Sequence, residues 1–430
     1  MAQPVYSLAQ CKKMALENNA QIKNSNLEIK ASEQIKKATY TKYFPTASAT
    51  LMSFRTTDPL ITAKIPAANL PVYDGNLANL ASAKQFAYFP GMNISALDKS
   101  TLGGISIVQP LFAGGRIVSG NKLATIGIDI SNRKAVLSKN EVLLRTEEQY
   151  WLVVSLHEKE KTLNAYSELL DTLYKQANDA YHAGLINRNE VLKVTLKQNE
   201  IRMNKLKLEN GIKLATMALC QYIGTSYDPR MAFTDKISKC KSPDEVYQKA
   251  EQALTNRQEY AMLQKGIEAE KLQTRIKKGE YMPEVGVGVG EIYQNITDNN
   301  KFNTMAFVSV KVPISGWWEA THSLKERQIR EQIAQNNCQD NTELLTLQMQ
   351  KGWNELEESY KQIQVAEDAI KQAEENLKIN NDNYKAGMIN ISDMLESQAL
   401  LQQTKDQLID VQTTYAVKLV NYLQVTGRYQ

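Results

Sequence analysis

The sequence predicts a mainly helical chain with a smaller β component, in which a unit of two strands and one long helical hairpin occurs twice. Three observations support this prediction. Short motifs from the first half recur in the second half. Two stretches of about 65 residues lack nearly all helix breakers. Four runs of about ten residues alternate apolar side chains with small or polar ones, which is typical of strands.

The internal repeat rests on two offsets. Residues 15–19 (ALENN) resemble residues 253–257 (ALTNR), at an offset of 238, and residues 181–187 (YHAGLIN) resemble residues 384–390 (YKAGMIN), at an offset of 203. The fall from 238 to 203 places an insertion of 35 residues in the first copy. Two copies of a unit this large are too few for a solenoid, so we interpret them as two halves of one subunit.

The offsets define the expected organisation of the chain. We expect a first repeat over residues 1–225, a linker over 226–242 and a second repeat over 243–430. The insertion, about 56–100, is predicted to be a long loop because four prolines cluster in it. These are Pro59, Pro66, Pro71 and Pro90.

The breaker-free stretches predict long helical hairpins over about 115–224 and about 316–427. Within each, apolar residues recur at the alternating steps of three and four that mark a narrow packed seam. In the first copy they are Leu163, Tyr166, Leu170, Leu173, Ala177 and Ala180, and in the second Ile363, Ala366, Ile370, Ala373 and Leu377, then Tyr384 after a polar Asn380. A helix of this length spans roughly 100 Å. Glycine at the helix end and asparagine before the returning helix predict each turn.

Four strands are expected at about 44–54, 102–112, 283–293 and 302–312. Ten alternating residues are about the length of a tilted strand that crosses a membrane. Four strands cannot close a barrel, and a membrane permits no open sheet edge, so three copies would supply a barrel of twelve. Trp317 and Trp318 follow the last strand, where an interfacial aromatic belt is expected. Buried core tryptophans are the alternative interpretation.

Composition argues against several classes of function. The chain has 51 Lys and Arg against 47 Asp and Glu, and the net charge of +4 forms no basic stripe for nucleic acid. The three histidines lie far apart, and no phosphate-binding loop or nucleophile elbow occurs, so we expect no enzyme, metal or cofactor. The N-terminus lacks signal-peptide features, so the protein is either cytosolic or a mature form with an added Met. A disulfide between Cys11 and Cys240 is possible, and the sequence does not decide whether it forms.

The chain resembles the TolC family of outer-membrane efflux proteins over essentially its whole length. The residues that carry the resemblance are the opening segment 6–10 (YSLAQ) with 15–19, the Phe44-Pro45 pair, and residues 109–116 (QPLFAGGR), together with both Ala-Gly turns. Each motif alone is weakly specific. Their order, duplication and spacing together are specific.

The resemblance implies a homotrimer with a twelve-stranded barrel in the outer-membrane lipid and a long α-helical barrel through the periplasm. A periplasmic adaptor (membrane fusion) protein and an inner-membrane pump or exporter would complete the conduit. Such a duct exports drugs or other substrates passively and is gated at the periplasmic tip of the helical hairpins.

Site residues follow from the same resemblance. The gate and selectivity residues fall on Asp393, Glu396, Glu190, Tyr384 and Arg188. The adaptor-contact tips fall on Gly184, Leu185, Gly387 and Met388. Ile389 stands where the best-known member has an arginine that locks the closed tip, and Arg188 of the other hairpin is the candidate substitute.

Alternatives accompany these expectations. Three symmetry copies of an acidic residue around a pore would attract cations, but acids in the first turn of a helix are also stabilised by the helix dipole alone. A soluble coiled-coil scaffold or adaptor would explain the long helices, though not the duplicated strands. The insertion is expected at the extracellular mouth, where it would constrict or cap the exit.

Overall fold

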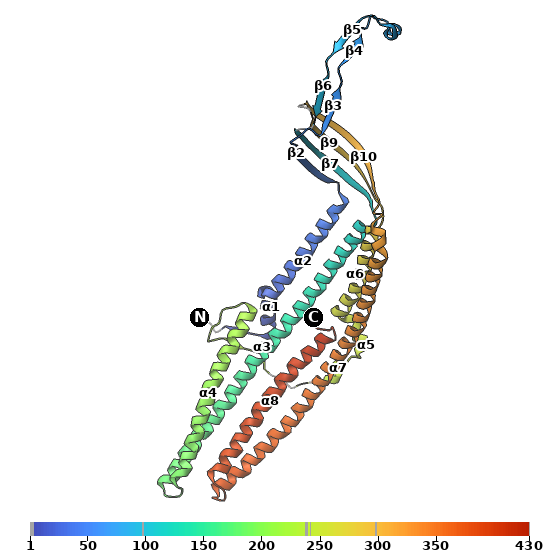
Figure 1. Ribbon diagram of the computed structural model, residues 1–430. Coiled ribbons are helices and arrows are strands. Elements are labelled where there is room, and N and C mark those ends of the chain that lie inside the picture. Colours follow the sequence, from blue (N-terminus) through green and yellow to red (C-terminus); the bar gives the residue numbers. More distant parts are fainter. Residues whose placement is uncertain (1–3, 97–98, 237–239, 241, 297–298, 430) are drawn as a thin grey trace. The chain divides into compact units, whose positions relative to one another are not determined.

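The computed structural model describes residues 4–96, 99–236, 240, 242–296 and 299–429 (Figure 1). Helices dominate, and the predicted fold class is confirmed. The α-helices are α1 (Leu8–Asn18), α2 (Ala20–Tyr40), α3 (Arg116–His182), α4 (Arg188–Ile223), α5 (Ala250–Ala253), α6 (Gln258–Glu280), α7 (Gly316–Lys385) and α8 (Ile391–Val425). The strands are β1 (Val5–Tyr6), β2 (Thr46–Arg55), β3 (Ile61–Ile65), β4 (Ala68–Pro71), β5 (Phe86–Phe89), β6 (Met92–Ala96), β7 (Lys99–Ala113), β8 (Ala232–Phe233), β9 (Glu284–Ile296) and β10 (Asn299–Lys311).

The chain forms two compact units. A helical unit comprises the described parts of residues 1–35, 124–270 and 330–430, and a β-unit comprises those of 36–123 and 271–329. The boundaries fall inside helices α2, α3, α6 and α7, and each unit draws on both predicted repeats. The division into two repeats therefore describes the order of elements along the chain, and it stays a prediction.

The long hairpins form where helix breakers are scarce. Helix α3 has 67 residues and α7 has 70. Beyond residue 120, α3 contains only Gly127, and beyond its first residue α7 contains only Gly352. Helices α4 and α8 return with 36 and 35 residues. The nearly equal lengths in the two copies reflect the same positions of the Ala-Gly turns.

The β-unit contains one four-stranded antiparallel sheet in the order β10-β9-β7-β2. Strands β2 and β10 are its edges, and neither edge is paired with another strand of the part of the chain that the structure describes. The two hairpins of the sheet, β2–β7 and β9–β10, come from different halves of the sequence. Each strand lies within a few residues of its expected range.

The two faces of this sheet differ in chemistry. The pairing register puts Ile105 and Ile107 of β7 on one face with Val289 of β9 and Val308 and Val310 of β10. All five side chains are exposed. The opposite face carries the small residues Ser48, Ser106, Gly286, Gly288, Gly290 and Ser309, together with the larger apolar residues Met52, Leu102, Met305 and Phe307.

The insertion is not the loop that its prolines predicted. Strand β3 pairs with β6, and β4 pairs with β5, so residues 61–96 form a two-stranded ribbon (Figure 1). Pro66 lies between β3 and β4, and Pro90 lies between β5 and β6 on the other strand of the ribbon. These two prolines interrupt the pairing between the β3–β6 ladder and the β4–β5 ladder, because proline lacks a backbone N–H. The pairing resumes beyond them.

The linker also has structure of its own. Strand β8 pairs in parallel with β1 at the start of the chain. The hydroxyl of Tyr150 on α3 donates to the Asp235 carboxylate (2.6 Å) beside this pair. Neither Cys11 nor Cys240 is part of a disulfide in the structure. Cys11 is fully buried, and burial raises its thiol pKa to about 12.

Two adjacent glycines connect β7 to α3, and the structure predicts that they respond differently to substitution. Gly114 (φ +61°) and Gly115 (φ +74°) are both left-handed, so alanine costs about 1–2 kcal/mol of backbone strain at either. Only at Gly114 would the new Cβ also meet backbone, 2.2 Å from the carbonyl oxygen of Gly279. Gly114→Ala should therefore lower the thermal unfolding temperature clearly more than Gly115→Ala. Equal losses would contradict this contact.

Candidate functional site

The turns of the two helical hairpins lie at the same end of the helical unit (Figure 1). Each turn closes with the same pair of hydrogen bonds. The Gly184 N–H donates to the Tyr181 carbonyl and the Leu185 N–H to the Ala180 carbonyl, both at 2.9 Å. At the second turn, Gly387 and Met388 donate in the same pattern, to Tyr384 and Asn383. These are Schellman motifs, which require a left-handed residue at the glycine position.

Asparagine caps start the returning helices, as expected. The Asn187 side chain accepts from the Glu190 N–H at 3.3 Å, and the Asn390 side chain accepts from Ser392 N–H at 2.8 Å and Asp393 N–H at 3.3 Å. The Asp393 carboxylate in turn accepts from the Asn390 N–H at 3.3 Å, which completes a capping box. Asp393 therefore has a local structural role.

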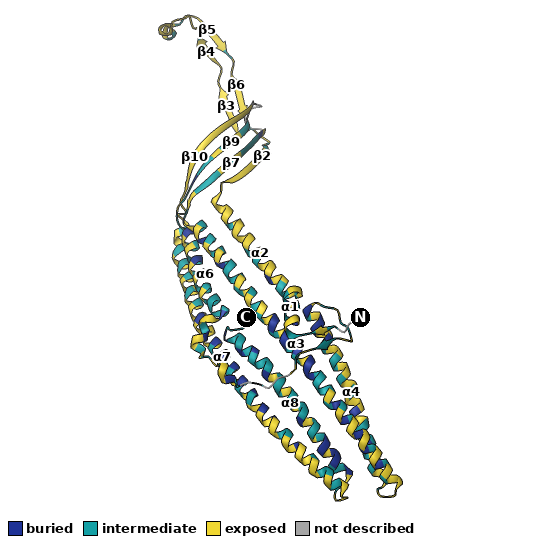
Figure 2. Cartoon of the chain, turned by 180° about the vertical axis from the view of Figure 1, so that it is seen from behind, coloured by how far each residue is buried: buried dark blue, intermediate teal, exposed yellow. Residues whose placement is uncertain are grey.

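An apolar cluster joins the two hairpins above the turns. It takes buried side chains from α3, α4 and α8, with partly buried ones of α7 packed against it. Figure 2 shows the buried bands of these helices. The predicted α3 seam supplies five of its members, and Ala180, the sixth seam residue, is not among them. The buried members are Leu163, Tyr166, Leu170, Leu173, Ala177, Val194, Ile201, Ile391, Met394 and Leu395.

Polar side chains bridge the hairpins farther from the turns. Lys159 of α3 forms an ion pair with Asp410 of α8 at 2.6 Å. Thr162 donates to Asp406 at 2.9 Å, and Gln402 donates to both Thr162 and Asp406. Sequence reasoning missed this network, because its members are ordinary solvated residue types and only the pairing of α3 with α8 identifies it.

Two of the predicted gate residues come together. Tyr384 packs at the edge of the apolar cluster, and its pKa is raised by burial and by the negative charge of Glu190 on the other hairpin. The Glu190 side chain is 18% exposed. One of its oxygens pairs with Lys193 at 3.0 Å, whereas the other is buried without a hydrogen-bond partner among the described residues. Such an acceptor is costly unless a donor reaches it.

The remaining gate residues lie on the surface of this chain. Glu396 and Arg188 are exposed, and Asp393 is partly buried in its capping box. Leu185 and Met388 at the turns are 78% and 69% exposed. Ile389 is partly buried, and its counterpart Ile186 packs on the apolar cluster. The first and the second turn therefore both have an apolar residue at this position, Ile186 and Ile389.

The two tryptophans lie in the β-unit, in the first turn of α7. Trp317 is 50% exposed and Trp318 is 82% exposed, which contradicts the interpretation of both as buried core residues within this chain. The Trp317 indole N–H donates to the Tyr281 carbonyl at 2.9 Å. The Lys277 ammonium lies 5.4 Å from the Tyr281 ring centroid. This mixture of apolar rings and charges fits an interface between lipid and water.

Other buried polar groups in the helical unit also lack hydrogen-bond partners among the described residues, and two of them lie close to the apolar cluster. The Tyr166 hydroxyl and one oxygen of Gln398 are buried at the junction of α3 and α8, with no partner among the described residues. Burial raises the Tyr166 pKa to about 12, with a smaller contribution from Glu200. The seam spacing identified Tyr166 as a core residue, but spacing alone cannot show that its hydroxyl is unpaired.

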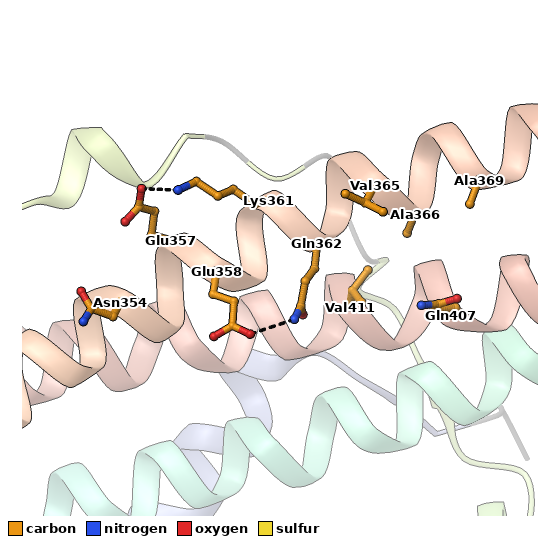
Figure 3. A pocket seen from close by; sticks show the side chains of 10 residues that line it. All are labelled: Asn354, Glu357, Glu358, Lys361, Gln362, Val365, Ala366, Ala369, Gln407 and Val411. Atoms are coloured by element: carbon orange, nitrogen blue, oxygen red, sulfur yellow. Dashed lines mark hydrogen bonds and ion pairs between the residues drawn. The ribbon is translucent and has the colours of Figure 1, made fainter.

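One surface groove lies between the side chains of two helices. The groove in Figure 3 has a volume of 810 Å³ and runs along α7 and α8, where Glu358 accepts from Gln362 and Lys361 pairs with Glu357. Within the described ranges, no three histidine, cysteine or acidic side chains lie close enough to hold a metal.

Among the described helices, none combines the length and the apolar composition needed to cross a membrane.

Comparison with known proteins identifies the fold. Residues 250–428 match the family model described as outer membrane efflux protein. VceC of Vibrio cholerae is 14% identical, with 98% of this chain and 96% of VceC covered at a TM-score of 0.72. CmeC of Campylobacter jejuni is 12% identical, with 98% and 86% covered at a TM-score of 0.74. MtrE of Neisseria gonorrhoeae is 13% identical, with 98% and 89% covered at 0.72. Comparison with curated proteins gives no match.

The capping box makes a prediction about the second turn. Asn390→Ala removes the acceptor of two backbone N–H groups and should cost about 1 kcal/mol of local stability. Hydrogen exchange of the Ser392 and Asp393 amides should become faster. Asn390→Asp retains the acceptor and serves as the matched control. Unchanged exchange in the alanine variant would show that the turn does not depend on this cap.

The unpaired Tyr166 hydroxyl makes a prediction about alkaline pH. The pKa of Tyr166 in the folded state, about 12, lies above the ordinary value of 10. The contribution of Tyr166 to the free energy of unfolding is therefore complete below pH 10 and is lost as the pH rises through 12. Tyr166→Phe should match wild-type stability at pH 7 and lose less stability between pH 10 and pH 12. Tyr181→Phe, at an exposed position, is the control. A strongly destabilised Tyr166→Phe at pH 7 would mean that the hydroxyl has a partner.

Proposed function

We propose that this chain, whose residues 250–428 match the family model described as outer membrane efflux protein, is one subunit of a homotrimeric exit duct that passes small molecules from the periplasm across the outer membrane. The observation that carries the proposal is the four-stranded sheet, which has two open edges and one apolar, exposed face. The fold shared with solved outer-membrane channels supports it.

The open edges require other copies of the chain. In a membrane no water is present to satisfy the free N–H and carbonyl groups of an edge strand, so the only stable sheet is a closed one. Edge strand β2 of one copy would pair with edge strand β10 of the next, and three copies would close a barrel of twelve strands. The apolar face would then contact lipid, and the glycine and serine face would line the pore.

The helical hairpins would form the periplasmic part of the duct and its gate. Three copies of Glu396 and Asp393 would place six carboxylates around the tip, where they would attract cations. Glu396 is the better candidate for a charge that faces the pore, because Asp393 is engaged in the capping box. The buried oxygen of Glu190 beside Tyr384 supports a gate whose closing contacts join the two hairpins.

The duct would depend on partners for energy. The sequence has no nucleotide-binding loop, so the proposed transport through this chain is passive and an inner-membrane pump or exporter must drive it. The exposed Leu185 and Met388 at the turns suit end-to-end contact with a periplasmic adaptor protein, because exposed apolar residues at a tip mark an interaction surface. A soluble scaffold is disfavoured, since it would leave the apolar face of the sheet in water.

Single-channel recordings in planar bilayers test this function. Wild-type protein purified in detergent should give small, cation-selective conductance steps. Glu396→Gln should lower the cation preference several-fold without unfolding the tip, because three charges are removed per trimer. Glu375→Gln, an exposed acid farther up α7, is the matched control.

Three outcomes separate the alternatives. Selectivity that is unaltered in Glu396→Gln would move the constriction away from this residue and leave the channel intact. Equal changes in both variants would indicate a general surface-charge effect. A protein that stays monodisperse without detergent and never inserts would contradict the duct itself.

A further inference from the structure

The ribbon of residues 61–96 has one polar and one apolar face. In the β3–β6 ladder, Ala63 pairs with Ile94 and Ile65 with Met92, which places these side chains and that of Ile61 on the same face. The other face carries Thr62 and Lys64 opposite Ser95 and Asn93. All of these residues are exposed within the chain, as the colouring of the ribbon in Figure 2 shows.

Apolar exposure continues beyond the prolines. In the β4–β5 ladder, Phe86 and Tyr88 share one face and are 58% and 70% exposed, and Leu70 on the other face is 49% exposed. The end of the ribbon is a defined turn, in which Asp74 accepts from the Asn76 N–H at 3.0 Å and from the Asn79 side chain at 2.9 Å. These bonds lower the Asp74 pKa. Leu77 follows this turn and is 77% exposed.

A ribbon of this kind needs a partner. Two strands alone are at best marginally stable in water, and a contiguous apolar face of this kind normally marks a contact surface. Lipid is a poor occupant, because the β2–β7 ladder of ten residue pairs already has the length of a membrane crossing before the ribbon begins. No charged side chain of the β3–β6 ladder lies on the apolar face, so a charged partner surface would not be complementary.

The position of the ribbon in the sheet indicates another copy of the chain. The ribbon continues the β2–β7 hairpin, and β2 is the edge strand that would meet β10 of the next copy. The connection within the hairpin at the other edge, β9–β10, is short, because β9 ends at residue 296 and β10 begins at residue 299. Each seam between copies would therefore carry one long ribbon beside one short turn, which leaves room for the ribbons to lean towards the threefold axis.

We infer that the apolar face of β3 and β6 packs against the same face of the ribbons of the neighbouring copies, and that this contact narrows the outer mouth of the duct. The inference rests on the proposed trimer. It specifies the contacting face, with Ile61, Ile65 and Ile94 inward and Thr62, Lys64 and Ser95 outward. A threefold axis brings the same residues of all three copies together at the axis, so three apolar faces that point inward can form one closed cluster.

Cysteine cross-linking distinguishes the two faces of one strand. Ile94→Cys and Ser95→Cys are adjacent in β6 and point to opposite faces. A disulfide needs Cβ atoms about 4 Å apart, so mild oxidation of purified trimers should give roughly tenfold more covalent dimer with Ile94→Cys than with Ser95→Cys. The wild-type chain, in which Cys11, Cys220 and Cys338 are buried, measures the background.

Two control measurements separate the proposed ribbon contact from loss of the trimer and from contact with lipid. Sedimentation in detergent establishes that both variants are trimers, and quenching of Ile94→Trp fluorescence by brominated phospholipid tests lipid as the occupant. Intact trimers with equal or absent cross-linking, or with strong quenching, would overturn the ribbon contact and leave the proposed duct standing. Loss of the trimer in the wild-type chain would overturn both.

Discussion

The helical unit depends on the apolar cluster that joins the two hairpins near their turns. Leu170 is fully buried there, and burial of a side chain of this size stabilises the fold by about 2–3 kcal/mol. Ile391 and Met394 of α8 enter the same cluster as Leu163 and Leu173 of α3. Because the seam is narrow, the other faces of the long helices stay polar. The unit is therefore built as a wall of helices with solvent-facing sides.

The turns below the seam are determined mainly by the backbone. Left-handed glycines end α3 and α7, and asparagine caps start α4 and α8, so each hairpin reverses within a few residues. The tips thereby present Leu185 and Met388 to the outside. The acidic residues near the turns also have local partners. The Asp393 carboxylate caps its own helix. One oxygen of Glu190 forms an ion pair with Lys193, and the other oxygen is buried. Charges at the tip have structural and functional roles at once.

The β-unit follows a different constraint, the pairing of backbone groups at sheet edges. Its four strands come from both halves of the sequence, and β7 and β9 pair through the centre of the sheet. Alternating glycines on β9 leave space for Phe307 of β10, since a Cβ at Gly288 would lie 2.5 Å from that ring. The sheet is thus well packed within the chain and incomplete at its edges. An incomplete edge, an apolar face and an amphipathic ribbon all point to assembly with further copies.

The sequence by itself determined the elements that depend on local chemistry. The absence of proline predicted the long helices, the seam spacing predicted the buried face of α3, and Gly184, Gly387, Asn187 and Asn390 predicted the turns. The four main strands followed from period-two alternation. The similarity of the two halves predicted that each element would have a counterpart.

Only the tertiary structure decided which distant residues meet. Glu190 and Tyr384 approach each other because two hairpins pack side by side, and no spacing along the chain encodes that distance. The Lys159–Asp410 pair and the unpaired Tyr166 hydroxyl have the same origin. The insertion was misjudged because proline was taken to exclude strands, whereas Pro66 and Pro90 both lie in the short gap between the two ladders and leave the ladders on both sides intact. Cross-strand register is a relation between two segments, and local composition cannot specify it.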